Sequence, residues 1–148
     1  MNIKYYEEKG FKPHCTMMPS NKYMQGIDIK YHDDNVHDNK GRQFEGMPAV
    51  YVLANKDGEV LKVGQTYNVR DRFYSQYKST VNATNDRIRE HIRGKEEILV
   101  YVYTMPKFQS TVLGYEVKTS YTAGLEEALL KEFKRVRKEL PVLNTMIK

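Results

Sequence analysis

The stretch AVYVLANKDGEVLKVGQT, residues 49–66, predicts a β-hairpin. Both of its halves are rich in β-branched and aromatic residues, and the Asp-Gly pair at positions 57–58 is typical of a tight turn. If the NKDG segment forms a four-residue loop, Tyr51 lies opposite Lys62, with the two Cβ atoms roughly 5 Å apart. A two-residue turn would shift the register by one step on each strand and keep both side chains on one face. Only a β-bulge would separate them.

The pairing of Tyr51 with Lys62 has a chemical consequence. A phenol beside an ammonium group has its ionised form stabilised, so its pKa falls and it becomes able to act as a general base. The alternative is structural, because tyrosine and lysine are both common on the exposed face of a hairpin. The rest of the sequence favours the chemical interpretation.

The composition predicts one soluble domain that carries an additional arm, because the 148 residues are 40% hydrophobic and contain no long apolar run. The N-terminus lacks an apolar signal segment, so we expect a cytoplasmic protein with no membrane partner. The single cysteine, Cys15, allows no internal disulfide and no thiolate cluster for zinc.

We divide the chain into an N-terminal arm, residues 1–45, and a domain of residues 46–148. The arm mixes aromatic, proline and polar residues without a steady period, and it ends in a polar stretch, residues 32–41, with two histidines and three aspartates. A metal site there would need a rigid scaffold, so a solvated loop is the favoured interpretation.

The positive charge lies in the second part of the chain. Residues 1–45 carry seven Lys and Arg against seven Asp and Glu, whereas the remainder carries seventeen against twelve. Residues 62–95 alone hold eight basic residues against three acidic ones, a local excess that suits phosphate backbones. Tyr67, Tyr74 and Tyr77 are interleaved with them. The alternative is the ordinary solvated face of a helix.

Two helices are predicted after the hairpin. Asn68 is the expected N-cap of a short helix that runs to Tyr77. Asn85 is the expected N-cap of a second helix, with Ile88 and Ile92 on its buried face and its arginines facing outward.

The remaining strands complete the predicted fold. Residues 98–105 are almost continuously apolar, which predicts a central strand, and residues 108–121 predict a further hairpin with Leu113-Gly114 near its turn. The fold class is therefore α+β, with a small central antiparallel sheet of about three strands flanked by helices.

The last helix, from about residue 124 to residue 137, contains an unusual carboxylate. At 100° per residue, Glu126 falls at about 100°, among the apolar residues, whereas Glu127 lies on the polar side. A carboxylate among core residues is costly unless it is paired, protonated or bound to a metal, so Glu126 is a candidate site residue. The alternative is an edge residue that bends outward to Arg135 or Arg137. The apolar residues are Leu125, Leu129, Phe133 and Val136, within about 80° of one another, and Leu130 at about 140°.

Residues 47–145 resemble the GIY-YIG nuclease family in five places that occur in the family's order. Each tripeptide alone is weak evidence, but the five together make a fairly specific match. The matching segments are Ala49-Val50-Tyr51, Lys62-Val63-Gly64, the stretch from Gly64 to Arg72, Glu126 with Leu129-Leu130, and Pro141 to Asn144.

Two positions depart from the family pattern. The tyrosine of the second tripeptide is Lys62, and Gln76 stands four positions after Arg72, where relatives often have His or Tyr. Tyr74 or Tyr77 would then supply that contact.

The resemblance implies a phosphodiesterase site. Tyr51 would accept the proton of the attacking water, Lys62 would lower the phenol's pKa or contact the scissile phosphate, and Arg72 would stabilise phosphoryl charge. Glu126 would hold one divalent cation, which would be Mg²⁺ or, as a substitute, Mn²⁺. Asn144 would maintain the geometry of the active site without contacting the substrate. The residues expected to bind nucleic acid are Gln65, Asn68, Arg70, Tyr74, Tyr77, Arg87, Arg89 and Arg93.

The predicted function is that of a metal-dependent DNA endonuclease that leaves 5′ phosphates, a small stand-alone enzyme resembling type II restriction enzymes. Because cutting two strands takes two sites, we expect a homodimer on double-stranded DNA, with the arm and the second hairpin as candidates for dimerisation or sequence reading. Two alternatives stay open: a catalytically silent nucleic-acid-binding or regulatory module on the same fold, and an RNA-directed nuclease.

Overall fold

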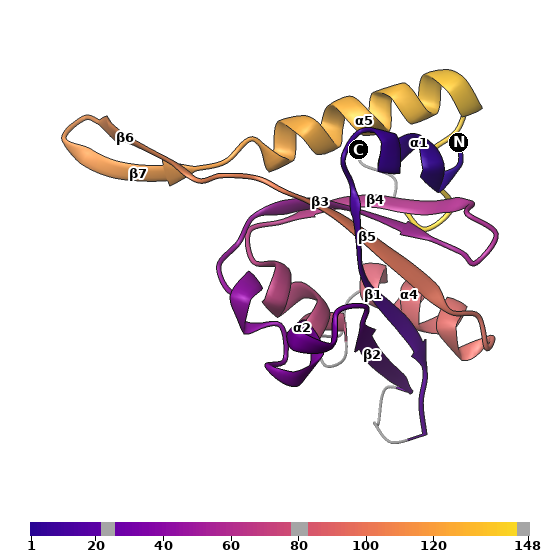
Figure 1. Ribbon diagram of the computed structural model, residues 1–148. Coiled ribbons are helices and arrows are strands. Elements are labelled where there is room, and N and C mark those ends of the chain that lie inside the picture. The colour runs from indigo at the N-terminus through magenta and orange to yellow at the C-terminus, as the bar shows by residue number, and fades with distance from the viewer. Residues whose placement is uncertain (22–25, 78–82, 145–148) are drawn as a thin grey trace.

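The computed structural model describes residues 1–21, 26–77 and 83–144. Its centre is an antiparallel sheet with the strand order β2-β1-β5-β3-β4 (Figure 1). The α+β class with a central antiparallel sheet is therefore confirmed. The strands are β1 (Lys12–Pro19), β2 (Ile27–Tyr31), β3 (Ala49–Ala54), β4 (Val60–Thr66) and β5 (Ile98–Thr104).

The sheet has five strands rather than the expected three, because the N-terminal segment contributes β1 and β2. β1 pairs with β5, and its residues 14–17 are all buried. A strand covered on both faces shows no alternation of apolar and polar residues, so its sequence carries no period-two signal. The segments on both sides of the boundary between residues 45 and 46 thus contribute strands to one sheet.

The β3–β4 hairpin forms where the sequence predicts it, but its register differs. Tyr51 lies opposite Gly64, Lys62 lies opposite Leu53, and a bulge interrupts the pairing between Leu53 and Ala54. The expected direct pairing of Tyr51 with Lys62 is therefore wrong. Their shared face is confirmed, because Lys62 faces Leu53, which lies two residues from Tyr51 on the same strand.

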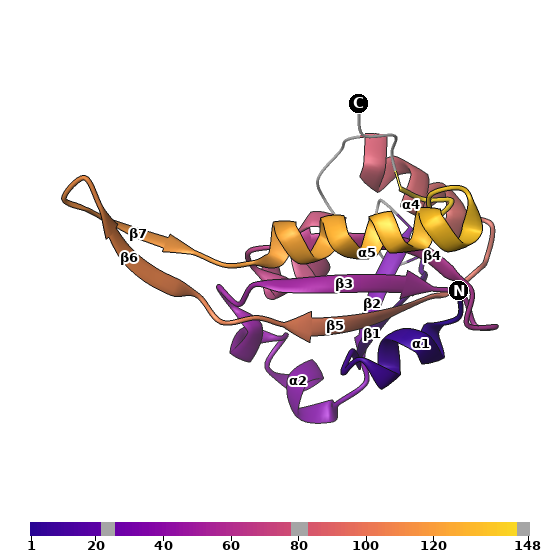
Figure 2. The ribbon, with the colours of Figure 1, turned by 90° about the horizontal axis from the view of Figure 1, so that it is seen from above.

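Helices cover both faces of the sheet (Figures 1 and 2). One face carries α1 (Ile3–Glu8) and α5 (Thr122–Arg137), which pack on the side chains of Val50, Val52 and Val63. The other face carries α2 (Asp34–Asp38), η1 (Arg42–Phe44), the π-helical turn η2 (Asp71–Gln76) and α4 (Ala83–Arg93). β5 is the central strand, as its apolar sequence predicts.

The helices after β4 agree in part with the prediction. Asn68 caps the first helix, since its Oδ1 accepts a hydrogen bond of 3.1 Å from the backbone N–H of Asp71. Ile88 and Ile92 are buried as expected. Asn85 is not an N-cap, because α4 already begins at Ala83. Residues 78–82 lie outside the described part of the chain, and Lys78 of the basic run is among them.

The buried face of α5 is close to the predicted one. Leu129, Leu130 and Phe133 are buried, and Leu125 is half-buried against the same core. Val136 is 48% exposed, so its predicted place in the core is wrong. Phe133 is the last buried residue of the helix, and the final turn lies beyond the core.

A second hairpin projects from the body of the molecule (Figures 1 and 2). It consists of β6 (Phe108–Val112) and β7 (Tyr115–Thr119), which form a separate two-stranded sheet. Its turn is Leu113-Gly114, where both residues have positive φ, so the predicted hairpin and its turn are confirmed.

The polar stretch of residues 32–41 contains a short helix, α2, whose N-cap is Asp33. The expectation of a simple loop is therefore wrong, because the Asp33 carboxylate accepts the backbone N–H of Asn35 and so nucleates a helical turn. Within the described ranges, His, Cys, Asp and Glu nowhere gather in threes that could hold a metal ion. None of the described helices has the length and apolar character needed to cross a bilayer.

Candidate active site

Tyr51 lies at the centre of a cluster of polar side chains on the face that carries η2. Its hydroxyl shares a hydrogen bond of 2.9 Å with the hydroxyl of Tyr77, and Arg72 Nε donates to it at 3.3 Å. Lys62 Nζ lies 5.8 Å from the centre of the Tyr51 ring, and the Lys62 side chain is buried, with 6% exposed. The structure thus brings two of the predicted catalytic residues, Lys62 and Arg72, to the phenol of a third, Tyr51.

Gly64 makes room for the Tyr51 ring. A Cβ atom at position 64 would overlap Cζ and Oη of Tyr51, which stands opposite it in the hairpin. The second tripeptide therefore ends in glycine for a steric reason, which the sequence pattern alone did not show.

The charges around Tyr51 shift the ionisation of its phenol. Burial by itself would raise the pKa of Tyr51, but the positive charges of Lys62 and Arg72 and the hydrogen bonds from Tyr77 and Arg72 outweigh burial and lower that pKa. The pKa of Tyr77 moves the other way, raised by burial and by its neighbour Tyr51. Of the two phenols, Tyr51 is therefore the one prepared to lose its proton.

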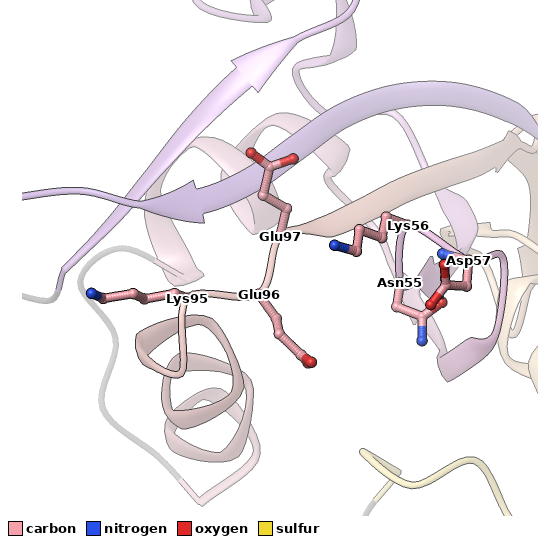
Figure 3. Close-up of a pocket in the computed structure, with 6 residues that line it drawn as sticks. All are labelled: Asn55, Lys56, Asp57, Lys95, Glu96 and Glu97. Carbon is pink, nitrogen blue, oxygen red and sulfur yellow. Dashed lines mark hydrogen bonds between the residues drawn. The ribbon is translucent and has the colours of Figure 1, made fainter.

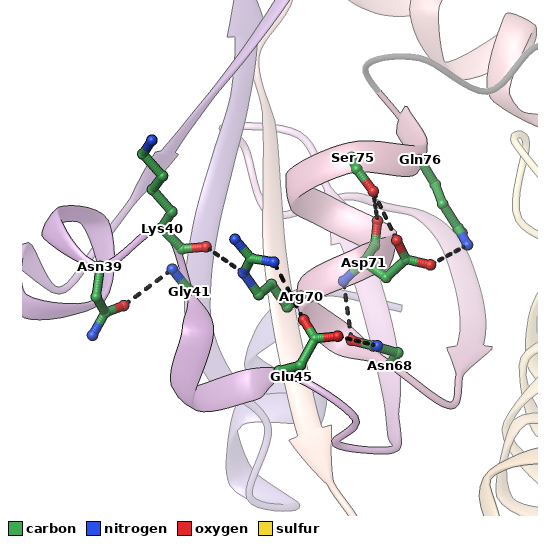
Figure 4. Close-up of polar contacts among 9 residues, drawn as sticks. All are labelled: Asn39, Lys40, Gly41, Glu45, Asn68, Arg70, Asp71, Ser75 and Gln76. Atoms are coloured by element: carbon green, nitrogen blue, oxygen red, sulfur yellow. Dashed lines mark hydrogen bonds and ion pairs between the residues drawn. The ribbon is translucent and has the colours of Figure 1, made fainter.

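Arg72 is held by a chain of side chains from its own helical turn. Its Nη1 donates to Gln76 Oε1 at 3.0 Å, and Gln76 Nε2 donates to Asp71 Oδ2 at 2.9 Å. The other Asp71 oxygen accepts from Ser75 Oγ at 2.8 Å, as Figure 4 shows. The carboxylate of Asp71 fixes the amide of Gln76, which in turn orients the guanidinium of Arg72.

The π-helical form of η2 explains why Tyr77 reaches the site. A π-turn contains about one residue more than an α-turn, so the residue five positions after Arg72 comes close to where the fourth would otherwise lie. Tyr77 therefore contacts Tyr51, and Arg72 lies 5.1 Å from its ring centre. Tyr74 lies instead against the guanidinium of Arg70, at 4.8 Å. Of the two tyrosines left open by the sequence, Tyr77 is therefore the one that contacts Tyr51 and Arg72.

Glu126 lies in the second turn of α5, within electrostatic reach of Lys62 and Arg72. It is half-buried, and it accepts a hydrogen bond from the backbone of Gln65. Burial raises the pKa of the Glu126 carboxyl, while the positive charges of Lys62 and Arg72 and the Gln65 hydrogen bond oppose that rise. Glu127 is exposed and forms an ion pair with Lys131 at 3.0 Å. The predicted difference between the two glutamates is confirmed.

Asn144 fixes the strand that carries Lys62 and Gly64. Its Oδ1 accepts from Val63 N at 3.0 Å and its Nδ2 donates to Val63 O at 2.8 Å. Arg87 holds the same segment, since its guanidinium donates to the carbonyl oxygens of Val142 and Asn144 at 2.6 and 3.3 Å. Both residues act on the backbone around the site and neither touches Tyr51 in these contacts.

Several residues expected to bind nucleic acid have partners within the protein. Arg70 donates to Lys40 O at 3.0 Å and pairs with Glu45 at 3.3 Å, and Asn68 also donates to Glu45 (Figure 4). Gln65 accepts from Thr122 Oγ1 at 3.0 Å. These contacts join the loop before β3 and the start of α5 to the site.

Arg89 corrects the expectation that the arginines of α4 face outward. It is fully buried, its Nε donates to Tyr77 O at 3.0 Å, and its Nη2 donates to Gln76 O at 3.4 Å. The carbonyl groups at a helical C-terminus lack partners and carry partial negative charge, so a cation is favourable there. Arg89 caps η2, whereas Arg87 and Arg93 are exposed.

A hollow of about 230 Å³ at the root of the second hairpin was not foreseen from the sequence. Tyr67, which follows β4, lines it together with two lysines, and Ser120 adjoins Thr122, the partner of Gln65. The lysines are Lys107 and Lys118, from segments far from the basic run, so charge counting along the chain could not find them.

A hollow of about 360 Å³ lies at the opposite end of the β3–β4 hairpin (Figure 3). Lys95, Glu96 and Glu97 line it, and their side chains point in different directions. It begins at Asn55, roughly 13 Å along the strand from Tyr51. Its charges do not converge, so it is not a second centre of chemistry.

One carboxylate near a buried lysine and a half-buried arginine matches a particular kind of metal site. Mg²⁺ keeps several waters and is often held by one or two carboxylates together with substrate phosphate. Glu126 offers one such carboxylate beside Lys62 and Arg72, which suit the phosphate. The residues present therefore fit a cation that is shared with the substrate.

Comparisons with known proteins concern the fold and part of the sequence. No family model matches the chain. The UvrABC system protein C of Acinetobacter baumannii (strain SDF) is 29% identical over 103 residues, which are 69% of this chain and 14% of that protein. The chain thus matches a small part of a much longer relative.

Two solved structures share the fold. Restriction endonuclease HPY188I in complex with product DNA has a TM-score of 0.61 and 18% identity, with 99% of this chain and 87% of that chain covered. A mutant of bacteriophage T4 EndoII has a TM-score of 0.69 and 14% identity, with 98% of this chain and 100% of that chain covered. At these identities the likeness concerns the fold alone.

Proposed function

We propose that the chain is a DNA endonuclease of the GIY-YIG type that resembles type II restriction enzymes. The observation that carries the proposal is the position of Lys62 and Arg72 beside the phenol of Tyr51, whose pKa they lower. The carboxyl group of Glu126 lies within electrostatic reach of the same two cations. The match to UvrABC system protein C and the shared fold of a DNA-bound restriction endonuclease support it.

In the proposed reaction a water molecule attacks the scissile phosphorus. Tyr51 takes a proton from that water, the new bond joins the water oxygen to phosphorus, and the bond from phosphorus to the 3′ oxygen breaks. The 3′ oxygen receives a proton from solvent water, and the other fragment keeps a 5′ phosphate. Tyr51 is fully buried, so we infer that Arg72 must turn from its hydroxyl toward the phosphate before water can reach it.

Each neighbour of Tyr51 has a proposed part in this reaction. Arg72 binds the phosphoryl oxygens with two N–H groups, which a lysine could not do. The positive charge of Lys62, a buried residue of β4, lowers the pKa of the Tyr51 phenol. Glu126 would hold Mg²⁺, or Mn²⁺ in its place, and a bound cation would neutralise charge on a phosphate oxygen and the leaving 3′ oxygen. Asn144 positions β4 beneath them.

The proposed DNA contacts come from side chains that still reach solvent. Arg93 and Arg87 on α4 are exposed, and Arg70 and Tyr74 are partly so, which makes them candidates for contacts with phosphates. Lys107 and Lys118 add positive charge at the root of the second hairpin. Tyr77 and Arg89 are buried, so we assign them no contact with nucleic acid.

The test is cleavage of supercoiled plasmid and phage genomic DNA by the purified protein, with Mg²⁺ or with chelator. We expect metal-dependent cutting whose fragments can be religated, because ligation requires 5′ phosphates. The Tyr51→Phe variant should lose cutting and keep its fold by circular dichroism. A mobility shift without cutting, unchanged by chelator, would contradict the proposal. It would favour a catalytically silent DNA-binding module, in which Lys62 marks the loss of activity.

A further inference from the structure

Gln76 lies between a side chain that only donates hydrogen bonds and one that only accepts them. A guanidinium group has N–H donors and no acceptor, whereas a carboxylate has acceptors and no donor. Gln76 Oε1 accepts from Arg72 Nη1 at 3.0 Å, and Gln76 Nε2 donates to Asp71 Oδ2 at 2.9 Å (Figure 4 shows the second contact). A carboxamide forms both bonds in one orientation, with its oxygen toward Arg72. We call this hydrogen-bonded series of Asp71, Gln76 and Arg72 the relay.

The π-helical form of η2 makes the relay possible. On an α-helix, side chains three and four positions apart are neighbours. Asp71 and Gln76 are five positions apart, and the wider π-turn places them on one side of the helix. The same turn brings Tyr77 to the hydroxyl of Tyr51. One feature of the backbone therefore sets both the contact between the two phenols and the relay.

The relay has little to contribute to the stability of the fold. Asp71 is exposed, Gln76 and Arg72 are half-buried, and none of the three belongs to the buried apolar clusters. Water competes for such hydrogen bonds, and ordering long side chains costs conformational entropy. The effect of the relay therefore falls on Arg72, the member that reaches the Tyr51 hydroxyl.

The Gln76 amide orients Arg72 without neutralising its charge. A carboxylate in direct contact would pair with the guanidinium and compete with phosphate for it. The neutral amide holds Nη1 and keeps the charge of Asp71 one side chain away. Among the described residues, the hydrogen bonds of Arg72 engage its Nε and Nη1, so its Nη2 stays available to phosphate oxygens.

We propose that Asp71 and Gln76 are positioning residues, which hold Arg72 by Nη1 while its Nε–H leaves the Tyr51 hydroxyl and the guanidinium turns onto the scissile phosphate. This inference rests on the proposed endonuclease function and adds two residues to its site. The orientation of the Gln76 amide is what matters, and Asp71 acts by fixing that orientation.

The first test observes Arg72 without DNA or metal. The exchange of its Nε–H with water is measured by ¹⁵N–¹H NMR, and its signal is identified by its absence from Arg72→Lys. We expect exchange about tenfold faster in Gln76→Leu and in Asp71→Ala, which corresponds to the loss of one hydrogen bond. The matched control is Gln43→Leu, an exposed glutamine of η1, which should leave the exchange unchanged. Circular dichroism should be alike for all these variants.

The second test separates kcat from KM in the cutting of supercoiled plasmid. Gln76→Leu should lower kcat by about 10- to 100-fold, because Arg72 is no longer held in place for the reaction. KM should stay within about twofold, because DNA affinity rests on many other phosphate contacts. Adding Asp71→Ala to Gln76→Leu should change kcat by less than about twofold, because Asp71 acts through Gln76.

The conservative variant Asp71→Asn distinguishes orientation from charge. Its amide oxygen can still accept from Gln76 Nε2, so we expect kcat within about threefold of the unchanged protein, whereas Asp71→Ala should lose about tenfold or more. An equal loss in the two Asp71 variants, or unchanged Nε–H exchange in Gln76→Leu, would overturn the proposal. If the unchanged protein does not cut DNA, the endonuclease proposal fails, and the exchange measurement alone decides whether Asp71 and Gln76 position Arg72.

Discussion

The absence of a side chain at Gly64 leaves the space that the ring of Tyr51 occupies. The Gly64→Ala substitution would push a methyl group into the ring of Tyr51, which is buried and has no free space to move into. We expect a loss of about 1–3 kcal/mol in the free energy of unfolding and a loss of cleavage. Urea denaturation and plasmid cutting measure both effects.

The control for Gly64 is Gly124, a helical glycine around which an added Cβ would meet nothing within 4 Å. The Gly124→Ala variant should be as stable as the unchanged protein or more so by up to about 1 kcal/mol, because alanine favours helix. Equal stability and activity for Gly64→Ala and the unchanged protein would show that Tyr51 is placed differently.

The hydrogen bond between Tyr51 and Tyr77 predicts a pH effect. Activity should rise with pH along a limb set by the pKa of Tyr51, which lies below the ordinary value of 10.0 because Lys62 and Arg72 outweigh burial. Removing the hydroxyl in Tyr77→Phe removes one of the causes that lower this pKa. The limb should therefore move to higher pH in a profile of kcat/KM, and an unmoved or lowered limb would mean that Tyr51 is not the base.

At the scale of elements, the segment of residues 141–144 acts as a brace for β4. Asn144→Ala would remove both hydrogen bonds to Val63 and leave a buried backbone N–H and C=O without partners. We expect it to cost about 2–3 kcal/mol in the free energy of unfolding, measured in urea. Val142→Ala removes an exposed side chain of the same segment and should cost little. Equal costs would show that the brace does not depend on the amide.

The helices and strands also show which features can be predicted from the sequence. The hairpin turns, the Asn68 cap and the phase of Glu126 follow from local patterns, and the structure confirms them. The bulge shifts the pairing of β3 with β4 by one residue, and the π-turn of η2 adds one residue to a helical turn. Local sequence propensity does not predict either change. Arg89 was misplaced because its partners are carbonyl groups of another helical segment.

At the scale of the whole molecule, the N-terminal strands are part of the support of the site. His14 on β1 packs against Phe73 of η2, and Phe73 packs edge-on against Tyr51, with ring centres 5.8 and 5.1 Å apart. The pairing of β1 with β5 spans more than eighty residues of sequence, so the N-terminal segment could not be placed in the sheet from its own pattern.

His14 predicts how the molecule responds to acid. Burial, and to a lesser degree the charge of His32, lowers the pKa of His14 to about 4, from 6.5 in an unfolded chain. Between these values the unfolded state binds more protons, so the contribution of His14 to stability is complete above pH 6.5 and is lost as the pH falls toward 4. The loss is on the order of 3 kcal/mol.

The His14→Phe variant keeps a ring among Tyr31, Phe44 and Phe73 but cannot bind a proton. Urea denaturation at pH 7 and at pH 4.5 should therefore show a smaller loss of stability on acidification than in the unchanged protein. If both proteins lose the same amount, the acid sensitivity arises elsewhere in the molecule.

The most direct test of the active-site proposal compares two adjacent glutamates of α5. Glu126 lies within electrostatic reach of Lys62 and Arg72, whereas Glu127 is exposed and paired with Lys131. The initial rate of supercoiled plasmid cutting in Mg²⁺ should fall by about 100-fold or more in Glu126→Gln, since the proposed cation site is lost. It should stay within about twofold of the unchanged protein in Glu127→Gln. Equal rates for the two variants, whether both low or both unchanged, would contradict the proposed site.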